Sequence, residues 1–166
     1  PLGGPKVLVS GSAIGFYGDR GEEALTEASP RGTGFLADVC VAWEDATRDA
    51  ERAGLRVAYA RTGVVLTRSG GLLARLLPLF KVGLGGRIGS GRQFMSWISI
   101  TDEVAALAWM IDHDLAGPVH LVAPEAVTNP EFSRALGKVL RRPARLPVPP
   151  LGPALLYGRH LVRELM

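Results

Sequence analysis

The chain has 166 residues, of which 47% are hydrophobic and 21% are charged, and its formal net charge is +3. This composition is too apolar for a disordered chain, and the length suits one domain or part of a larger one. No apolar stretch reaches the roughly 18 residues that a membrane span needs, so we expect no membrane partner. The single cysteine, Cys40, excludes an internal disulfide and a multi-thiolate metal site.

The small basic excess argues against nucleic-acid binding. Acidic residues are scattered among the arginines and lysines, whereas a nucleic-acid footprint needs a basic stripe or patch. The nearest candidate cluster is Lys138, Arg141, Arg142 and Arg145. These cations suit a solvated helix end, where they complement the helix dipole. The sequence therefore predicts no nucleic-acid partner.

Strand and helix patterns alternate along the first part of the chain. A short apolar run over 6–10 indicates a buried strand, and the glycine-rich residues 12–34 indicate a loop. Apolar residues at helical spacing predict a helix over 35–53. A strand over 55–60 and a further apolar run over 64–66 follow. The predicted buried face of the helix consists of Leu36, Val39, Cys40, Trp43 and Thr47.

The second part continues the alternation, so the fold class is α/β with a mainly parallel sheet. Thr101 and Thr128 are the expected N-caps of two helices, and Glu131 is the acid of a capping box with Thr128. Trp109 occupies a helical position that predicts core packing. The expected elements are a helix over 70–82 with Leu73, Leu76, Leu77 and Phe80 inward, a loop over 83–91, a strand over 94–100, a helix over 102–112, a strand over 119–122, a helix over 130–140, a proline-rich connector over 143–153 and a helix over 155–166.

Glycines after the first strand raise the question of a dinucleotide fingerprint. Gly11, Gly15 and Gly18 follow the spacing G-x3-G-x2-G, which differs from the fingerprint G-x-G-x-x-G. A phosphate site also needs a helix N-terminus directly after the glycines, and no helical pattern begins there. We favour the alternative, a strand end that presents Ser10 and Ser12 at the carboxyl edge of the sheet, where open α/β folds bind ligands.

Six segments together resemble the second half of an extended short-chain dehydrogenase/reductase. More narrowly, they resemble its atypical subfamily of nucleoside-diphosphate-sugar epimerases. The segments are 12–19 (SAIGFYGD), 35–44 (FLADVCVAWE), 61–66 (RTGVVL), 83–93 (GLGGRIGSGRQ), 97–102 (WISITD) and 123–132 (APEAVTNPEF).

The resemblance implies the C-terminal part of an NAD(P)-binding, Rossmann-like, doubly wound parallel sheet. Residues 1–66 belong to this sheet, residues 67–166 form mostly a small substrate-binding subdomain, and residues 94–122 return to the main sheet. The family's glycine-rich first βα unit lies before residue 1, so we expect a fragment of a longer, cytoplasmic protein. The implied cofactor is NADP or NAD, with NADP preferred, and a homodimer is compatible with the family.

The resemblance implies hydride transfer to or from a nicotinamide, with a base that takes the hydroxyl proton. The family uses a Tyr and a Lys four residues apart on one helix, and a Ser at the neighbouring strand end. Ser12 fits the serine role, with one extra residue in the loop. The Tyr and Lys positions hold Leu36 and Cys40 instead, and Tyr17 is the only nearby phenol. Local packing is the alternative role for both Ser12 and Tyr17.

Cofactor and substrate contacts are also expected from the resemblance. Strand ends at Ser10, Gly11, Arg61, Thr62 and Gly63 would border the nicotinamide, although Arg61, Thr62 and Gly63 would equally suit a plain turn. Met95 and Ser99 stand where many relatives carry Arg and His, so a mobile surface loop is the alternative to a diphosphate site. The expected substrate contacts are Arg87, Gly89, Gly91, Arg92, Gln93 and Trp97.

The remaining polar residues show no metal-ligand spacing, since His113, His120 and His160 stand apart. We therefore expect no metal. The sequence indicates an epimerase- or dehydratase-like NAD(P)-dependent oxidoreductase acting on a nucleotide-sugar-like substrate. The alternative is a catalytically silent NADP(H)-binding or regulatory module that kept the fold and lost the Tyr-Lys pair.

Overall fold

The computed structural model describes residues 4–144. The chain divides into two compact units. The first consists of Pro1–Gly63 and Ile98–Val122, and the second of Val64–Trp97 and Ala123–Met166. The connector expected over 143–153 continues past the described residues, and the helix expected over 155–166 lies outside them.

The first unit is built on a parallel sheet in the order β1-β2-β6. The strands are β1 (Val7–Ala13), β2 (Arg56–Thr62) and β6 (Gly117–Leu121). β1 is longer than the run over 6–10 predicted, because it continues into residues 11–13. The sheet confirms the predicted α/β class with parallel strands.

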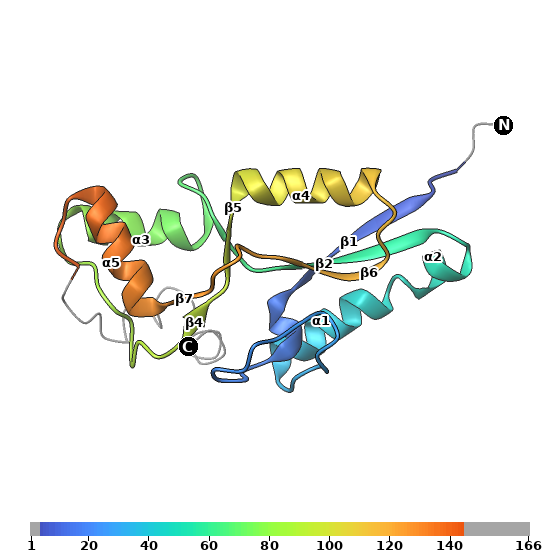
Figure 1. Ribbon diagram of the computed structural model, residues 1–166, viewed down its shortest axis with the longest axis horizontal. Coiled ribbons are helices and arrows are strands. Elements are labelled where there is room, and N and C mark those ends of the chain that lie inside the picture. Colours follow the sequence, from blue (N-terminus) through green and yellow to red (C-terminus); the bar gives the residue numbers. More distant parts are fainter. Residues whose placement is uncertain (1–3, 145–166) are drawn as a thin grey trace. The chain divides into compact units, whose positions relative to one another are not determined.

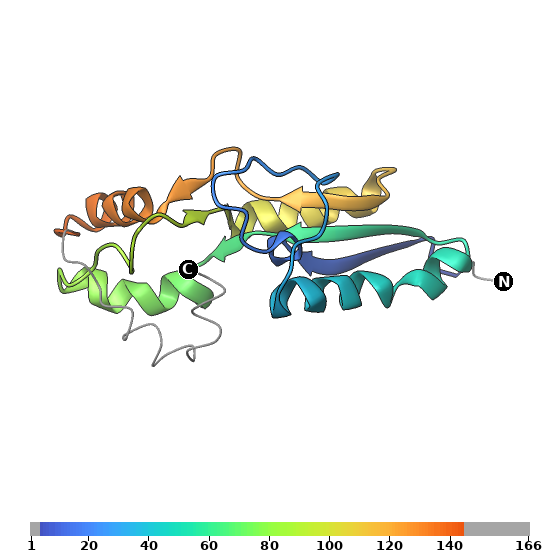
Figure 2. The same cartoon turned by 90° about the horizontal axis from the view of Figure 1, so that it is seen from below.

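Helices cover both faces of this sheet. Figure 1 shows α4 (Ile100–Asp112) on one side and α1 (Phe35–Asp45) with α2 (Arg48–Arg52) on the other, and Figure 2 shows the same layers from below. A short 3-10 helix, η1 (Ile14–Tyr17), follows β1. Because no α-helix begins after Gly11, the fingerprint interpretation is wrong, as the spacing had indicated.

The single helix predicted over 35–53 is two helices, α1 and α2. The break falls at Thr47, whose hydroxyl lies 2.8 Å from the Glu44 carbonyl oxygen and 3.2 Å from the Tyr59 hydroxyl, within hydrogen-bond distance of both. The buried face is also rotated from the predicted one. Cys40 is buried, but Trp43 is 51% exposed, so its predicted core position is wrong. Polar contacts between this helix and the sheet set its orientation, and the spacing of apolar residues does not indicate such contacts.

α4 begins earlier than predicted. Ser99 is its N-cap, and its hydroxyl oxygen accepts the Asp102 N–H at 3.0 Å, so Thr101 lies inside the helix. Trp109 is 50% exposed and stacks on the His113 ring at 4.1 Å, which contradicts its predicted core role. The side of the helix that faces the sheet instead carries Met110, which is fully buried.

The second unit contains β3 (Val64–Leu66), α3 (Gly71–Lys81) and α5 (Asn129–Leu140). Two short strands, β4 (Phe94–Met95) and β7 (Val127–Thr128), pair antiparallel. β7 was not predicted. The strand expected over 94–100 is interrupted at Ser96, after which β5 (Trp97–Ser99) crosses the boundary between the units.

Two predictions for the helices of this second unit are confirmed. Phe80 of α3 is buried, with Leu73, Leu76 and Leu77 half-buried on the same side. The Glu131 carboxylate accepts the Thr128 N–H at 2.8 Å at the start of α5. Gly85 lies against the Phe80 ring, where a Cβ would come within 2.4 Å of a ring carbon, so only glycine fits there.

Candidate active site

The register of the parallel sheet places three polar side chains in one row. Ser12 of β1 pairs with Arg61 of β2, and Arg61 pairs with His120 of β6. Residues in register point to the same face, and the row lies near the carboxyl ends of the strands. This is the edge at which open α/β sheets bind ligands.

Arg61 is the centre of this row and is only 4% exposed. Its Nε and Nη2 donate to the two Glu44 carboxylate oxygens, each at 2.9 Å. Nη1 donates to the Tyr17 hydroxyl at 2.7 Å and to the Glu27 carbonyl at 3.2 Å, and the guanidinium lies 3.5 Å from the centre of the Phe16 ring. The guanidinium is thus enclosed by protein groups, and its charge is paired inside the unit.

Tyr17 and His120 form a close pair beside Arg61. The Tyr17 hydroxyl lies 2.5 Å from His120 Nε2, and Tyr17 is 2% exposed. Burial raises the pKa of the Tyr17 phenol, although the Arg61 hydrogen bond opposes this shift. Burial also lowers the pKa of His120, against the attraction of Glu27, so the imidazole is neutral near pH 7. A neutral Nε2 can accept the phenol proton while Arg61 donates to the phenol oxygen.

Ser12 is held by Glu44 of α1. It is 6% exposed, and its hydroxyl donates to Glu44 Oε1 at 2.7 Å. Burial raises the pKa of the Glu44 carboxyl, but the hydrogen bonds from Arg61 and Ser12 outweigh burial and lower the pKa overall. Glu44 is therefore ionised, and the proton of the serine hydroxyl is committed to it.

The positions of the family's Tyr and Lys lie under η1. A Cβ on Gly15 would lie 3.4 Å from Leu36 Cβ and 3.7 Å from Cys40 Sγ. Cys40 is 3% exposed, and burial raises the pKa of its thiol, which makes it an unreactive core residue. The backbone of η1 thus packs directly on the helix face that the resemblance predicts to carry the family's base.

The strand ends predicted to border a cofactor differ in accessibility. Gly11 is exposed, and no atom lies within 4 Å of where its Cβ would be. Ser10 is half-buried. The Thr62 hydroxyl donates to Glu103 Oε1 at 2.8 Å, and the Gly63 N–H donates to the Leu121 carbonyl at 3.0 Å.

Five of the six predicted substrate residues share one loop of the second unit that is bonded to α5, and Trp97 follows in β5. The Ile88 N–H donates to Asn129 Oδ1 at 2.7 Å, and Ser133 Oγ donates to the Gly86 carbonyl at 3.0 Å. Within the loop, Gln93 Nε2 donates to the Ile88 carbonyl at 3.0 Å. Gly89 and Gly91 have positive φ, Arg87 and Arg92 are exposed, and Trp97 is half-buried.

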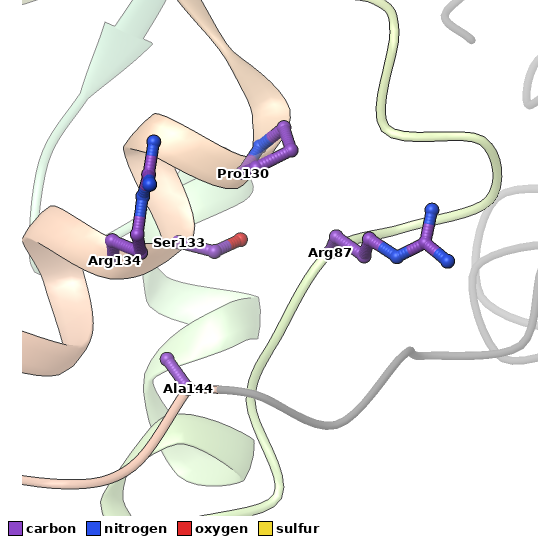
Figure 3. Close-up of a pocket in the computed structure, with 5 residues that line it drawn as sticks. All are labelled: Arg87, Pro130, Ser133, Arg134 and Ala144. Carbon is purple, nitrogen blue, oxygen red and sulfur yellow. The ribbon is translucent and has the colours of Figure 1, made fainter.

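A hollow of about 250 Å³ separates part of this loop from α5 (Figure 3). It is lined by Arg87, Pro130, Ser133, Arg134 and Ala144. Figure 3 shows Ser133 directed toward the loop, whereas the guanidinium of Arg87 extends away from α5. The two arginine head groups therefore do not converge on one point.

Metal-ligand clusters and membrane-spanning helices are both absent from residues 4–144. In this range, no three His, Cys, Asp or Glu side chains come together as metal ligands would. Over the same range, no helix combines the length and hydropathy required to cross a lipid bilayer.

Comparison with known proteins connects this chain to one group of relatives. It is 50% identical over 156 residues to the epimerase family protein Mb2239 of Mycobacterium bovis, covering 93% of this chain and 52% of that protein. It is 40% identical to a chloroplastic SDR39U1 homolog of Arabidopsis thaliana, over 93% of this chain and 44% of that protein. The chain is a homologue of the SDR39U1-type epimerase family proteins. It spans about half the length of these relatives, and no family model matches it.

Solved structures support the same relationship. Human SDR39U1, solved with NADPH, is 34% identical and superposes with a TM-score of 0.86, over 97% of this chain and 55% of that one. A nucleoside-diphosphate sugar epimerase from Corynebacterium glutamicum is 38% identical with a TM-score of 0.74, over 96% of this chain and 37% of that one. The predicted epimerase-like family and its Rossmann-like fold are thereby confirmed.

Three residues of the site were not singled out from the sequence. Glu44 lay within a quoted segment, but its pairing with Arg61 depends on the contact of α1 with the sheet. His120 was considered only as a metal ligand, and its partner Tyr17 is 103 residues away. Glu27 lies in a long loop whose path no sequence pattern indicates.

Proposed function

We propose that this chain forms part of an epimerase- or dehydratase-like oxidoreductase that uses NADP(H) or NAD(H) and acts on a nucleotide-sugar-like substrate. The observation that carries this proposal is the likeness to human SDR39U1, a protein solved with NADPH, over 97% of this chain. That likeness favours NADP(H) over NAD(H). The bound nicotinamide would supply the hydride acceptor and donor.

The residues present fit a cofactor lying against the open end of β1. Gly11 is exposed and has open space where a side chain would be, so a group can approach the strand closely there. Thr62 and Gly63 lie at the carboxyl edge of the same sheet, and Ser10 lies in the middle of β1 opposite Tyr59; we propose all three as further contacts. The Arg61 side chain takes no part, because its guanidinium is enclosed by Glu44, Tyr17 and Glu27.

The substrate side of the proposal rests on the loop of the second unit. Arg87 and Arg92 are exposed guanidinium groups, which suit the phosphate oxygens of a nucleotide sugar. The positive-φ residues Gly89 and Gly91 shape this loop. We propose Gln93 and Trp97, which flank β4, as further substrate contacts.

The acid–base role is proposed for Ser12 and Tyr17, with His120 as the proton acceptor of Tyr17. As the hydride leaves the sugar carbon, the hydroxyl proton passes to Tyr17, and the phenol proton passes to His120 Nε2. The 2.5 Å contact between Tyr17 and His120 supports this route. Burial of both hydroxyls, with Leu36 and Cys40 at the family's base positions, favours the second candidate, a silent cofactor-binding module.

A graft separates these candidates. Residues 1–166 would replace the matched segment of human SDR39U1, and NADPH binding to the folded graft would be followed by nicotinamide fluorescence. We expect binding within about tenfold of the parent protein, a difference of about 1.4 kcal/mol. Gly11→Val should abolish binding by filling the open space, whereas Gly4→Val, in the exposed segment before β1 where an added Cβ also meets open space, should not.

The same graft tests catalysis. With NADP+ bound and nucleotide sugars added, a change in nicotinamide absorbance that His120→Gln removes would support the oxidoreductase. A folded graft that fails to bind NADPH or NADH would contradict the cofactor assignment. Firm cofactor binding without any absorbance change across uridine, thymidine and guanosine diphosphate sugars would favour the silent module.

A further inference from the structure

The segment that follows η1, residues 18–33, forms a strap across the first unit. Residues 21–24 and 26–28 are exposed. Bonds within the strap are local, such as the Arg20–Glu23 ion pair at 2.8 Å and the bond from the Thr26 N–H to Ser29 Oγ at 3.0 Å. At its end, the Gly32 N–H donates to the Phe16 carbonyl at 2.9 Å.

Glu27 forms the hydrogen bonds that join the middle of the strap to the sheet. Its carboxylate Oε1 accepts the backbone N–H of His120 at 3.0 Å and lies 3.8 Å from His120 Nδ1. Its backbone carbonyl accepts from Arg61 Nη1 at 3.2 Å. Glu27 thereby contacts β2 and β6 together, directly over the row at the carboxyl edge.

We infer that the strap is a lid over the row of Ser12, Arg61 and His120, and that Glu27 is its latch. The nitrogen of Arg61 that donates to the Glu27 carbonyl also donates to the Tyr17 hydroxyl at 2.7 Å. With the strap in place, Tyr17 is 2% and Ser12 is 6% exposed. The inference rests on the proposed function, because that function requires these hydroxyls to meet a substrate.

The latch is built to release more easily than the rest of the cluster. The Glu27 side chain is 44% exposed, whereas Glu44 and Arg61 are 12% and 5% exposed in their ion pair. Water can replace the partners of a half-exposed carboxylate, so its contacts contribute little to stability. Since most of the strap is already solvated, lifting it exposes little apolar surface and requires only local opening.

The test uses the 166-residue chain without cofactor or substrate. Hydrogen exchange at the His120 amide reports the latch directly, because that amide donates to Glu27. Nitration of Tyr17 by tetranitromethane, located by peptide mapping, reports whether a small solute reaches the phenol. We expect Glu27→Ala to increase both rates about tenfold, while the amides of β2 keep their protection. Glu22→Ala, in the same exposed strap, should match the wild-type chain.

The outcomes are distinct. Unchanged nitration of Tyr17 in a folded Glu27→Ala chain would overturn the lid, as would an equal effect of Glu22→Ala. If Glu27→Ala also loses protection in β2, the Glu27→Gln variant replaces it as the test. Glutamine keeps an acceptor oxygen but carries no charge, so the His120 amide should still exchange faster than in the wild-type chain. A Glu27→Gln chain that behaves as wild type would then overturn the latch. Neither readout depends on cofactor binding, so failure of the proposed function leaves this test interpretable.

Discussion

Replacing Arg61 by methionine tests whether the buried guanidinium holds the site together. Arg61→Met keeps much of the side-chain length and removes the charge. Glu44, whose side chain is 12% exposed, is then left as a buried carboxylate whose remaining donor, among residues 4–144, is the Ser12 hydroxyl. Removing one partner of a buried ion pair costs about 3–5 kcal/mol. A domain has about 5–15 kcal/mol in total, so we expect a loss of about a fifth or more of the free energy of unfolding.

Urea unfolding followed by circular dichroism measures this loss. The matched control is Arg48→Met, because Arg48 pairs with Asp45 at 2.6 Å on the surface, with side chains 61% and 49% exposed. Such a pair contributes at most about 1 kcal/mol. The double variant Arg61→Met/Glu44→Met should recover much of the loss, since it removes the orphaned charge as well. A single Arg61→Met change no more costly than Arg48→Met would refute the reasoning.

Further predictions concern pH and packing. Burial lowers the pKa of His120, so below its ordinary value of 6.5 the unfolded chain binds a proton first. The contribution of His120 to the free energy of unfolding should be fully present above that pH. It should decrease as the pH falls further, until the imidazole of the folded chain is protonated as well. In urea midpoints measured across pH, His120→Gln should flatten this slope. Gly32→Ala should unfold the first unit in thermal melts, because its Cβ would lie 1.9 Å from a backbone oxygen of η1, whereas Gly11→Ala meets open space and should melt normally. Met110→Ala should cost about 2–5 kcal/mol in urea unfolding. Trp43→Ala should cost less, because Trp43 is 51% exposed, and an equal cost would contradict its placement.

The sequence predicted correctly those helices whose caps and apolar spacing also match the way they pack in the structure. The capping box of Thr128 and Glu131 involves residues only three apart in the sequence, and the structure contains it. The start of α5 was therefore predicted to within one residue. The inward face of α3 also followed from apolar spacing alone. The helix over 35–53 was wrong at Thr47 and Trp43, because the contact with the sheet is set by the hydrogen bonds that Glu44 accepts from Arg61 and by the contact of Thr47 with Tyr59.

Individual residues of the site could be predicted from the sequence, but the contacts between them could not. Ser12, Tyr17 and Arg61 were singled out by their places in family-like segments. The three side chains are buried together only because Glu44 and His120 contact them. The packing of α1 places Glu44 there, and the register of the sheet places His120 there, although both are distant in the sequence. Local sequence patterns carry no signal for such long-range polar contacts. The cofactor and substrate contacts of the individual residues remain predictions.

The packing of Gly15 on α1 limits how this protein could be re-engineered. Introducing Leu36→Tyr with Cys40→Lys would place two bulky polar side chains where the η1 backbone already fills the volume, since a Cβ on Gly15 would lie 3.4 Å from Leu36 Cβ. Such a retrofit would expel η1 and carry Tyr17 away from His120. A designer would therefore have to change the η1 segment and the facing residues of α1 together.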